Sequence, residues 1–252
     1  MKIKETYKTK EKIMNNSLTE EQVKVLNMSQ SVINEVRKVI IGKDEIIIKV
    51  LLSILAGGHI LIEDIPGVGK TTLAVALSKA LSLDYKRLQF TPDVLPTDVT
   101  GFTILNKETH KFEYKQGAAL TNLFLADEIN RTSSKTQSAL LEVMEEGKVT
   151  VDGITHKMPD PYIVIATQNP VGSIGTQMLP ESQMDRFIVR LTMGYPNIES
   201  EVAMLKSKQN LVPVDNVKPV VSAEDILQAR KVVENIYVSD QVFQYIVMLA
   251  NA

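Results

Sequence analysis

Short strand-like runs alternate along the chain with apolar stripes at helical spacing. The runs lie at residues 59–63, 85–90, 123–126, 162–166 and 187–191. A stripe follows the first run, where Leu73, Leu77 and Leu81 share one face of a helix. Strands that alternate with helices are typical of an α/β fold with a parallel sheet. The pattern therefore predicts a parallel sheet flanked by helices.

Helical patterns also precede the first run. Residues 1–16 are polar and lysine-rich, and we expect a mobile tail there. Residues 17–20 have the spacing of a capping box, after which Leu26, Ile33 and Val36 mark an apolar stripe. These signals predict a first helix that ends at about residue 38.

A second helix is predicted to begin at Asp44, which we expect to cap it, and to end at Gly57. The turn before it contains Ile41 and Gly42. This apolar turn either packs on a flat adenine ring or fills the core without any ligand. The pattern alone does not separate the two interpretations.

Two insertions carry β-hairpin patterns. Residues 91–117 break the helical pattern with prolines and glycines and contain one short pair of alternating strands. Residues 148–157 form a second pair around an Asp-Gly turn, which is a strong hairpin signal. Between the insertions, Ser134 is expected to cap a helix that continues to about Glu146.

Only helical stripes remain after residue 196. One contains Ile198, another Ile226, and the third consists of Val242, Ile246 and Leu249. We therefore expect an α/β core at residues 17–195 and a helical lid at residues 196–252.

Composition narrows the class of protein without naming a function. The chain has 252 residues, no cysteine, three histidines and a formal net charge of −2. Thiol chemistry is excluded, a zinc site is not indicated, and nucleic-acid binding is not favoured. The sequence contains neither an apolar run of transmembrane length nor a secretory signal, so we expect a cytoplasmic location and no transmembrane segment.

Residues 65–72 have the strand, glycine loop and helix context of a phosphate-binding loop. Gly67 and Gly69 let backbone N–H groups approach an anion, Lys70 reaches the β- and γ-phosphates, and Thr71 offers a hydroxyl to Mg²⁺. Asp64 stands where the Walker A pattern has glycine. Including the adenine interpretation, the predicted nucleotide-binding residues are Ile41, Gly42, Pro66, Gly67, Val68, Gly69, Lys70, Thr71 and Thr72.

Polar residues follow two of the other predicted strands. Asp127 and Glu128 end one run, where the first would hold Mg²⁺ through water and the second would polarise the attacking water. Asn169 ends the next run and either contacts the γ-phosphate or the water, or simply begins an Asn-Pro turn. The carboxyl ends of parallel strands meet at one edge, which predicts a single ligand site.

These segments resemble the MoxR family of AAA+ ATPases. The matching stretches are residues 63–71, 89–93, 98–101, 125–131, 166–170 and 179–187. The resemblance implies a P-loop AAA+ core with a central parallel five-stranded sheet, β-hairpin inserts and a small all-helical lid. It also accounts for Asp64, since family members commonly carry an acid there.

The resemblance implies a catalytic arrangement as well. Similar proteins form hexameric rings with ATP between neighbours, so Glu128 and Asn169 would act on ATP in their own subunit. Arg186 would be an arginine finger that enters the next subunit's site, with Arg131 and Arg190 as weaker candidates. Without the resemblance, a surface ion pair with Asp185 or Glu181 is the preferred interpretation of Arg186. The expected clients are partner proteins, including those with von Willebrand A domains.

The chain ends before the sensor arginine that family lids usually carry, so we expect an incomplete lid. The resulting prediction is an ATPase that uses hydrolysis to remodel or activate partner proteins. Two alternatives remain. One is a nucleic-acid motor that contacts phosphates through Lys111, Lys115, Lys148 and Lys157, and the other is a nucleotide-gated scaffold without turnover.

Overall fold

A computed structural model describes residues 18–65, 67–170, 179–195, 202 and 214–251. The predicted tail at residues 1–16, Pro66, and the stripe containing Ile198 lie outside these residues. Within the described part, no helix is long and apolar enough to cross a membrane.

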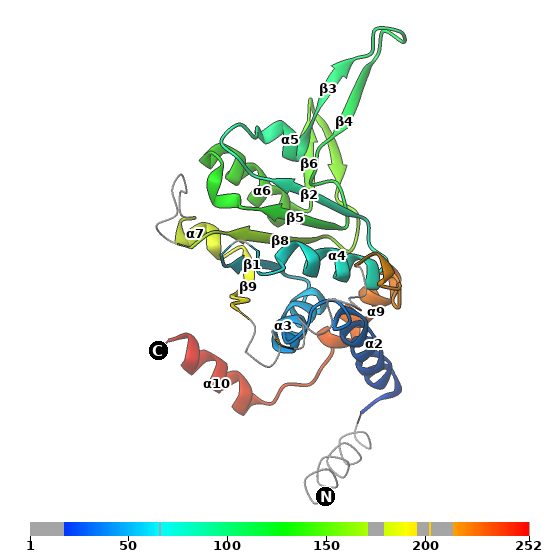
Figure 1. The fold of residues 1–252 in the computed structure, drawn as a ribbon, viewed down its shortest axis with the longest axis vertical. Coiled ribbons are helices and arrows are strands. Elements are labelled where there is room, and N and C mark those ends of the chain that lie inside the picture. The colour runs from blue at the N-terminus through cyan, green and yellow to red at the C-terminus, as the bar shows by residue number, and fades with distance from the viewer. Residues whose placement is uncertain (1–17, 66, 171–178, 196–201, 203–213, 252) are drawn as a thin grey trace, which may run out of the picture.

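A parallel sheet with the strand order β2-β5-β8-β1-β9 forms the centre of the fold (Figure 1). The strands are β1 (His59–Glu63), β2 (Tyr85–Gln89), β5 (Leu123–Asp127), β8 (Ile163–Gln168) and β9 (Phe187–Leu191). Every residue of β5 and β8 is buried, because these central strands are covered on both faces. The five-stranded parallel sheet implied by the family resemblance is confirmed.

Helices cover both faces of this sheet and create two hydrophobic cores (Figure 1). Ile60 and Ile62 of β1 face one core, whereas Leu61 faces the other, as the alternation of a strand requires. The first core is closed by α2 (Glu20–Val36), α3 (Asp44–Leu55), α4 (Lys70–Ala80) and α9 (Ala223–Glu234). The second is closed by α5 (Pro96–Thr100) and α6 (Ser134–Glu146).

The two predicted hairpins are present and project from the sheet (Figure 1). They consist of β3 (Gly101–Leu105) with β4 (Phe112–Gln116), and of β6 (Lys148–Val151) with β7 (Ile154–Lys157). Asp152 and Gly153 both have positive φ, 49° and 79°, as a two-residue hairpin turn requires. The rings of Tyr114 and His156 stack with centroids 3.8 Å apart, which joins the hairpins to each other.

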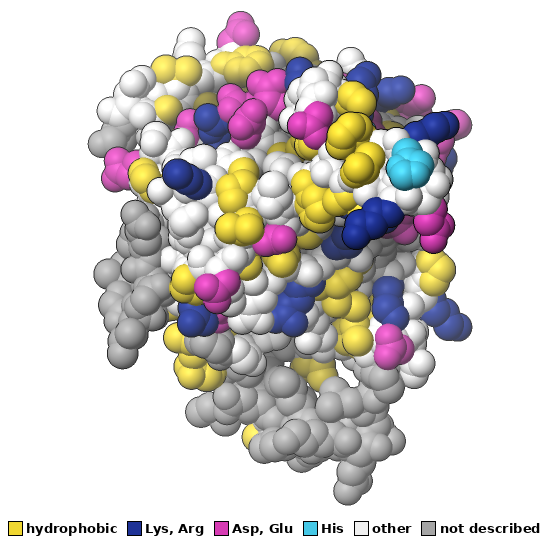
Figure 2. Space-filling model, turned by 90° about the horizontal axis from the view of Figure 1, so that it is seen from above, with side chains coloured by type: hydrophobic (Ala, Val, Ile, Leu, Met, Phe, Trp, Pro, Cys, Tyr) yellow, Lys and Arg dark blue, Asp and Glu magenta, His cyan; other side chains and the backbone are white. Residues whose placement is uncertain are grey.

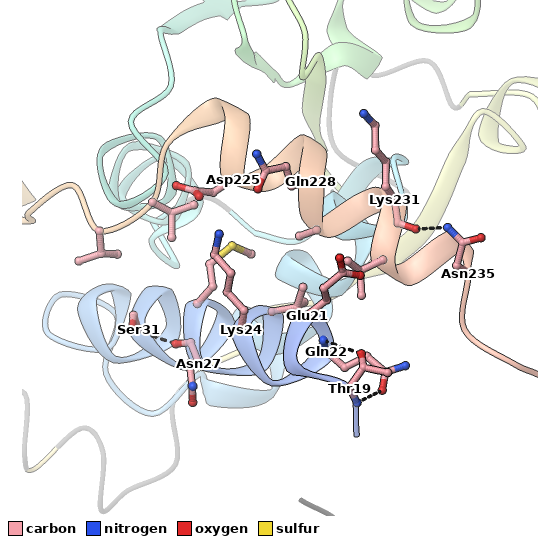
Figure 3. A pocket seen from close by; sticks show the side chains of 16 residues that line it. Thr19, Glu21, Gln22, Lys24, Asn27, Ser31, Asp225, Gln228, Lys231 and Asn235 are labelled. Carbon is pink, nitrogen blue, oxygen red and sulfur yellow. Dashed lines mark hydrogen bonds between the residues drawn. The ribbon is translucent and has the colours of Figure 1, made fainter. Parts of the chain in front are cut away.

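The two described C-terminal helices differ in how far their side chains are buried. α9 packs in the first core through Ile226 and Ala229, which are buried. By contrast, α10 (Asp240–Ala250) has no buried residue, so the predicted stripe of Val242, Ile246 and Leu249 is exposed. A groove of about 730 Å³ lies between α2 and α9, lined by side chains of both helices (Figure 3).

The short elements are 3₁₀ turns and one α-helical turn. They are η1 (Ile129–Arg131), α7 (Glu181–Met184) and η2 (Val214–Asn216).

Three predicted helix caps are wrong by one or two residues. Thr19, rather than Ser17, caps α2, and it forms the capping box with Gln22. Ser133 caps α6, so that Ser134 is already its first residue. Lys43 occupies the cap position of α3, because the carboxylate of Asp44 pairs with Arg37 at 2.8 Å instead.

The stripe predicted for the first helix is also only partly buried. Ile33 and Val36 belong to the first core, but Leu26 is 51% exposed. The buried residues of α2 all lie in its C-terminal half, so the N-terminal half, which contains Leu26, contributes little to the core.

Candidate nucleotide site

The predicted phosphate loop connects β1 to α4. Gly67 and Gly69 have φ of 88° and 94°, and Gly69 is the cap residue of α4. A Cβ at either position would meet no atom within 4 Å, so the left-handed backbone, and not lack of space, requires glycine. Val68 packs against the first core, while Thr71 and Thr72 lie in the first turn of α4. The loop therefore presents backbone N–H groups at a helix N-terminus.

Lys70 is nearly buried inside this loop. Its side chain is tied back, because Nζ donates a hydrogen bond of 2.6 Å to the backbone oxygen of Asp64. Burial lowers the pKa of the Lys70 ammonium, and the negative charges of Asp127, Asp64 and Glu128 partly oppose that shift. The cation is thus held beside the two acids that follow β5.

Asp127 is held from both neighbouring strands. Its Oδ1 accepts a hydrogen bond of 2.6 Å from the Thr167 hydroxyl of β8, and its Oδ2 accepts from Arg87 of β2, with Nη2 at 2.6 Å. The parallel register explains this, since β5 pairs with β2 on one side and with β8 on the other. The carboxylate is fixed in direction before any ligand binds.

Glu128 lies immediately beyond the strand with a left-handed φ of 58°. Its backbone N–H donates to the Thr167 hydroxyl at 2.8 Å, so this one hydroxyl contacts both acids. Burial alone would raise the pKa of the Glu128 carboxyl, but hydrogen bonds from Arg131, Asn169 and Gln89 bring it below its ordinary value. The carboxylate is consequently ionised and can accept a proton or orient water.

Asn169 is positioned by a residue that the sequence patterns did not single out. Asn130 donates from Nδ2 to the backbone oxygen of Asn169 at 3.1 Å and accepts from its N–H at 3.2 Å. The Asn169 side chain is free to hydrogen-bond the Glu128 carboxylate. Gln137 of α6 then donates to the Ile129 backbone oxygen at 3.1 Å, and this hydrogen bond joins η1 to α6. The only sequence signal for Asn130 was its place in a stretch that resembles the family.

The turn that contains Ile41 and Gly42 is connected to the phosphate loop through the segment after β9. Gly42 has a φ of 71°, which shapes the turn before α3. The next residue, Lys43, contacts the segment after β9, and Asp64 of the phosphate loop contacts the same segment. The turn and the loop therefore border a common region.

The three arginines considered for action across a subunit interface are all paired within the chain. Arg186 forms an ion pair with Glu145 at the end of α6, and not with its neighbour Asp185. Arg131 pairs with Glu128 at 2.8 Å. Arg190 lies 3.4 Å from Glu63. Of the three, Arg131 is the one in direct contact with the proposed catalytic carboxylate.

Magnesium fits the residues at this edge of the sheet. Within the described residues, no cluster of three or more acidic or histidine side chains could hold a metal ion alone. Mg²⁺ is usually bound by one or two protein oxygens together with waters and substrate phosphates. The Thr71 hydroxyl, in the first turn of α4, and the Asp127 carboxylate, at the end of β5, are oxygen groups of that kind.

A glycine loop after the first strand, with an Asp-Glu pair and an asparagine after neighbouring strands, defines the class of P-loop ATPases. The ATPase family associated with various cellular activities (AAA) matches residues 59–189. A crystal structure of a candidate ATPase from Cytophaga hutchinsonii covers 91% of this chain with 40% identity and a TM-score of 0.82, and the match covers 70% of that chain.

Curated relatives give the narrower family. The protein YeaC of Bacillus subtilis, which is uncharacterized, is 50% identical over 85% of this chain and 67% of its own length. Chaperone MoxR1 of Mycobacterium tuberculosis is 38% identical over 86% of this chain and 57% of its own length. The protein MoxR of Methylorubrum extorquens is 32% identical over 64% of this chain and 48% of its own length. The chain belongs to the MoxR family of AAA+ ATPases, and it spans about half to two thirds of these relatives.

Proposed function

We propose that this chain binds ATP with Mg²⁺ at the phosphate loop and hydrolyses it to ADP and phosphate. The observation that carries the proposal is the shared hydrogen-bond network of Asp127, Glu128 and Asn169 beside the buried Lys70. The phosphate-binding cation, the metal-binding acid and the water-orienting acid that phosphoryl transfer to water uses lie at a helix start or beside a strand end. Together with the family membership, this arrangement supports an active ATPase.

Each residue would have a separate role in the reaction. Lys70 and the loop N–H groups would bind the phosphates, whereas Thr71 and Asp127 would hold the metal, which would supply positive charge to the phosphate oxygens. Glu128 accepts the hydrogen bond of the attacking water, and the Asn169 amide orients that water or the γ-phosphate. The left-handed backbone at Glu128 directs its carboxylate to the same edge as Lys70.

Assembly would complete the site. We propose a homo-oligomeric, hexameric ring in which Arg186 leaves Glu145 and enters the neighbouring subunit's site, where its guanidinium stabilises charge on the transferred phosphoryl group. Hydrolysis would then remodel or activate a client protein, including clients with von Willebrand A domains. The chaperone name of MoxR1 supports a protein client, and the cytoplasmic location remains a prediction from the sequence.

The exposed face of the hairpins supports a protein partner over a nucleic acid. Phe112 is 77% exposed and Ile154 is 64% exposed. Hydrophobic, basic and acidic side chains are interspersed on this face of the molecule (Figure 2). A phosphate backbone would instead select a continuous basic stripe. Lys148, one of the four lysines considered for phosphate contacts, is already paired with Glu146 at 3.2 Å.

Two substitutions in the full chain test the proposed ATPase. Lys70→Ala should abolish ATP binding, whereas Glu128→Gln should retain it and lower steady-state phosphate release by about 100-fold or more. Glu108→Gln, on the exposed β3–β4 turn, is the matched control and should change neither quantity. ATP binding without phosphate release by the unsubstituted protein, under conditions that allow assembly, would refute hydrolysis and favour the nucleotide-gated scaffold.

A further inference from the structure

The carboxylate of Asp64 has a structural partner outside the phosphate loop. Asp64 is only 5% exposed, and its Oδ2 accepts a hydrogen bond of 2.5 Å from the backbone N–H of Gly194. Its Oδ1 accepts from the N–H of Ile65 at 2.8 Å, and its own N–H donates to Gln168 of β8 at 3.1 Å. The residue that departs from the Walker A pattern therefore links the loop, the sheet and the segment after β9.

Lys43 also binds the segment after β9. Its ammonium donates to three successive backbone oxygens, those of Met193, Gly194 and Tyr195, at 2.6, 3.0 and 2.8 Å. An ammonium has three N–H groups, so these contacts use its full donor capacity. Gly194 has a φ of 62°, a left-handed conformation that favours glycine. The segment is thus held at its N–H group by an anion and at its carbonyl groups by a cation.

We propose that Asp64 and Lys43 are positioning residues that clamp residues 193–195 between the phosphate loop and the turn that contains Ile41 and Gly42. The backbone oxygen of Asp64 is also the acceptor for Lys70. Any shift of the clamped segment would therefore pull on the residue that sets the resting place of the phosphate-binding cation. Residues 193–195 follow β9 and lead toward the predicted lid, so the clamp connects this segment to both the phosphate loop and the turn that contains Ile41 and Gly42.

A simpler interpretation treats Asp64 as a tolerated exception to the glycine pattern. On that interpretation, Asp64→Gly restores the standard loop and changes nothing else. The geometry predicts a different result, because glycine retains the backbone oxygen for Lys70 but removes the carboxylate that accepts from the Gly194 N–H. A hydrogen bond to an ionised group is stronger than a neutral one, so its loss should be measurable.

Hydrogen–deuterium exchange of the full chain without nucleotide provides the direct test. In Asp64→Gly, exchange of the Gly194 amide should accelerate by about tenfold or more, while amides of β5 and β8 stay unchanged. Lys43→Met keeps the stem of the side chain and removes its donors, and it should accelerate exchange in residues 193–195 as well. Asp64→Asn and Lys43→Arg keep an acceptor and donors, respectively, and should give intermediate rates.

Matched controls come from the neighbouring charged residues. Lys49→Met removes an exposed lysine of α3 that pairs with Glu45, and Glu63→Gln removes the acid directly before Asp64. Neither should alter exchange at Gly194. If Asp64→Gly and Lys43→Met leave this exchange unchanged, or if either control accelerates it equally, the clamp is refuted.

The functional consequence rests on the proposed ATPase and is measured separately. Because Glu128 and Asn169 do not contact the clamp, Lys43→Met should raise the KM for ATP several-fold and leave kcat within about twofold. A several-fold fall in kcat with no change in KM would contradict a role in nucleotide binding. The exchange experiment needs no ATP, so it decides on the clamp even if the chain does not hydrolyse ATP.

Discussion

Substitution of Asn130 tests how Asn169 is held in place. It is fully buried, and its side chain exchanges two hydrogen bonds with the backbone of Asn169, at 3.1 and 3.2 Å. Asn130→Ala removes both at once and leaves the Asn169 N–H and carbonyl without these partners. Each buried backbone group that loses its partner costs about 1–2 kcal/mol. The free energy of unfolding should therefore fall by about 2–4 kcal/mol.

The same substitution should reduce turnover beyond its effect on folding. The Asn169 side chain hydrogen-bonds to the Glu128 carboxylate, so a displaced backbone at Asn169 moves an amide that contacts the proposed base. Displacements of about 1 Å near reacting groups can lower kcat by up to 100-fold. We expect kcat to fall at least tenfold with little change in ATP affinity, as measured by phosphate release and by nucleotide titration.

Asn122→Ala is the matched control. Asn122 precedes β5, at the opposite end of the strand from Asn130, and donates a single hydrogen bond to the Pro161 oxygen at 3.1 Å. Its loss should lower stability in urea denaturation without a specific loss of kcat. If Asn130→Ala loses stability but retains kcat, the idea that Asn130 positions Asn169 for catalysis is wrong.

Two further predictions concern assembly and pH. Arg186→Ala should spare ATP binding but remove the rise in turnover per subunit that the unsubstituted protein shows with increasing protein concentration; a concentration-independent turnover that the substitution does not affect would exclude action across an interface. His59 accepts from the Val164 N–H at 3.0 Å, contacts the Met144 oxygen at 3.1 Å, and has a pKa that burial lowers below 6.5. Because the unfolded chain then binds more protons, the free energy of unfolding should fall as pH drops below about 6.5, and urea denaturation of His59→Gln should show a flatter pH dependence.

Local sequence patterns were sufficient to predict the elements whose conformation depends on residues close together in the chain. The phosphate loop at Gly67 and Gly69 and the Asp152-Gly153 turn each require a particular backbone, and the residue types report that requirement. The strand ending at Asp127 is apolar throughout because both of its faces are buried. The sequence could therefore predict the class of fold and the main acids of the site.

Contacts between distant segments could not be predicted in the same way. Arg87 meets Asp127, and Thr167 meets both acids, only because β2, β5 and β8 adopt a particular order and register. The bond from Asp64 to Gly194 joins residues that are far apart in the chain. Leu26 has the spacing of a core residue but is exposed, because spacing defines a helix face and not what covers it.

The stack between Tyr114 and His156 limits how the hairpins can be engineered. Each hairpin looks like a separate module that could be deleted or exchanged, since each has its own two strands and its own turn. The stacked rings make them a single unit, and removal of one hairpin would expose a ring face of the other. Chimaeras that exchange these hairpins between relatives should therefore transfer both together.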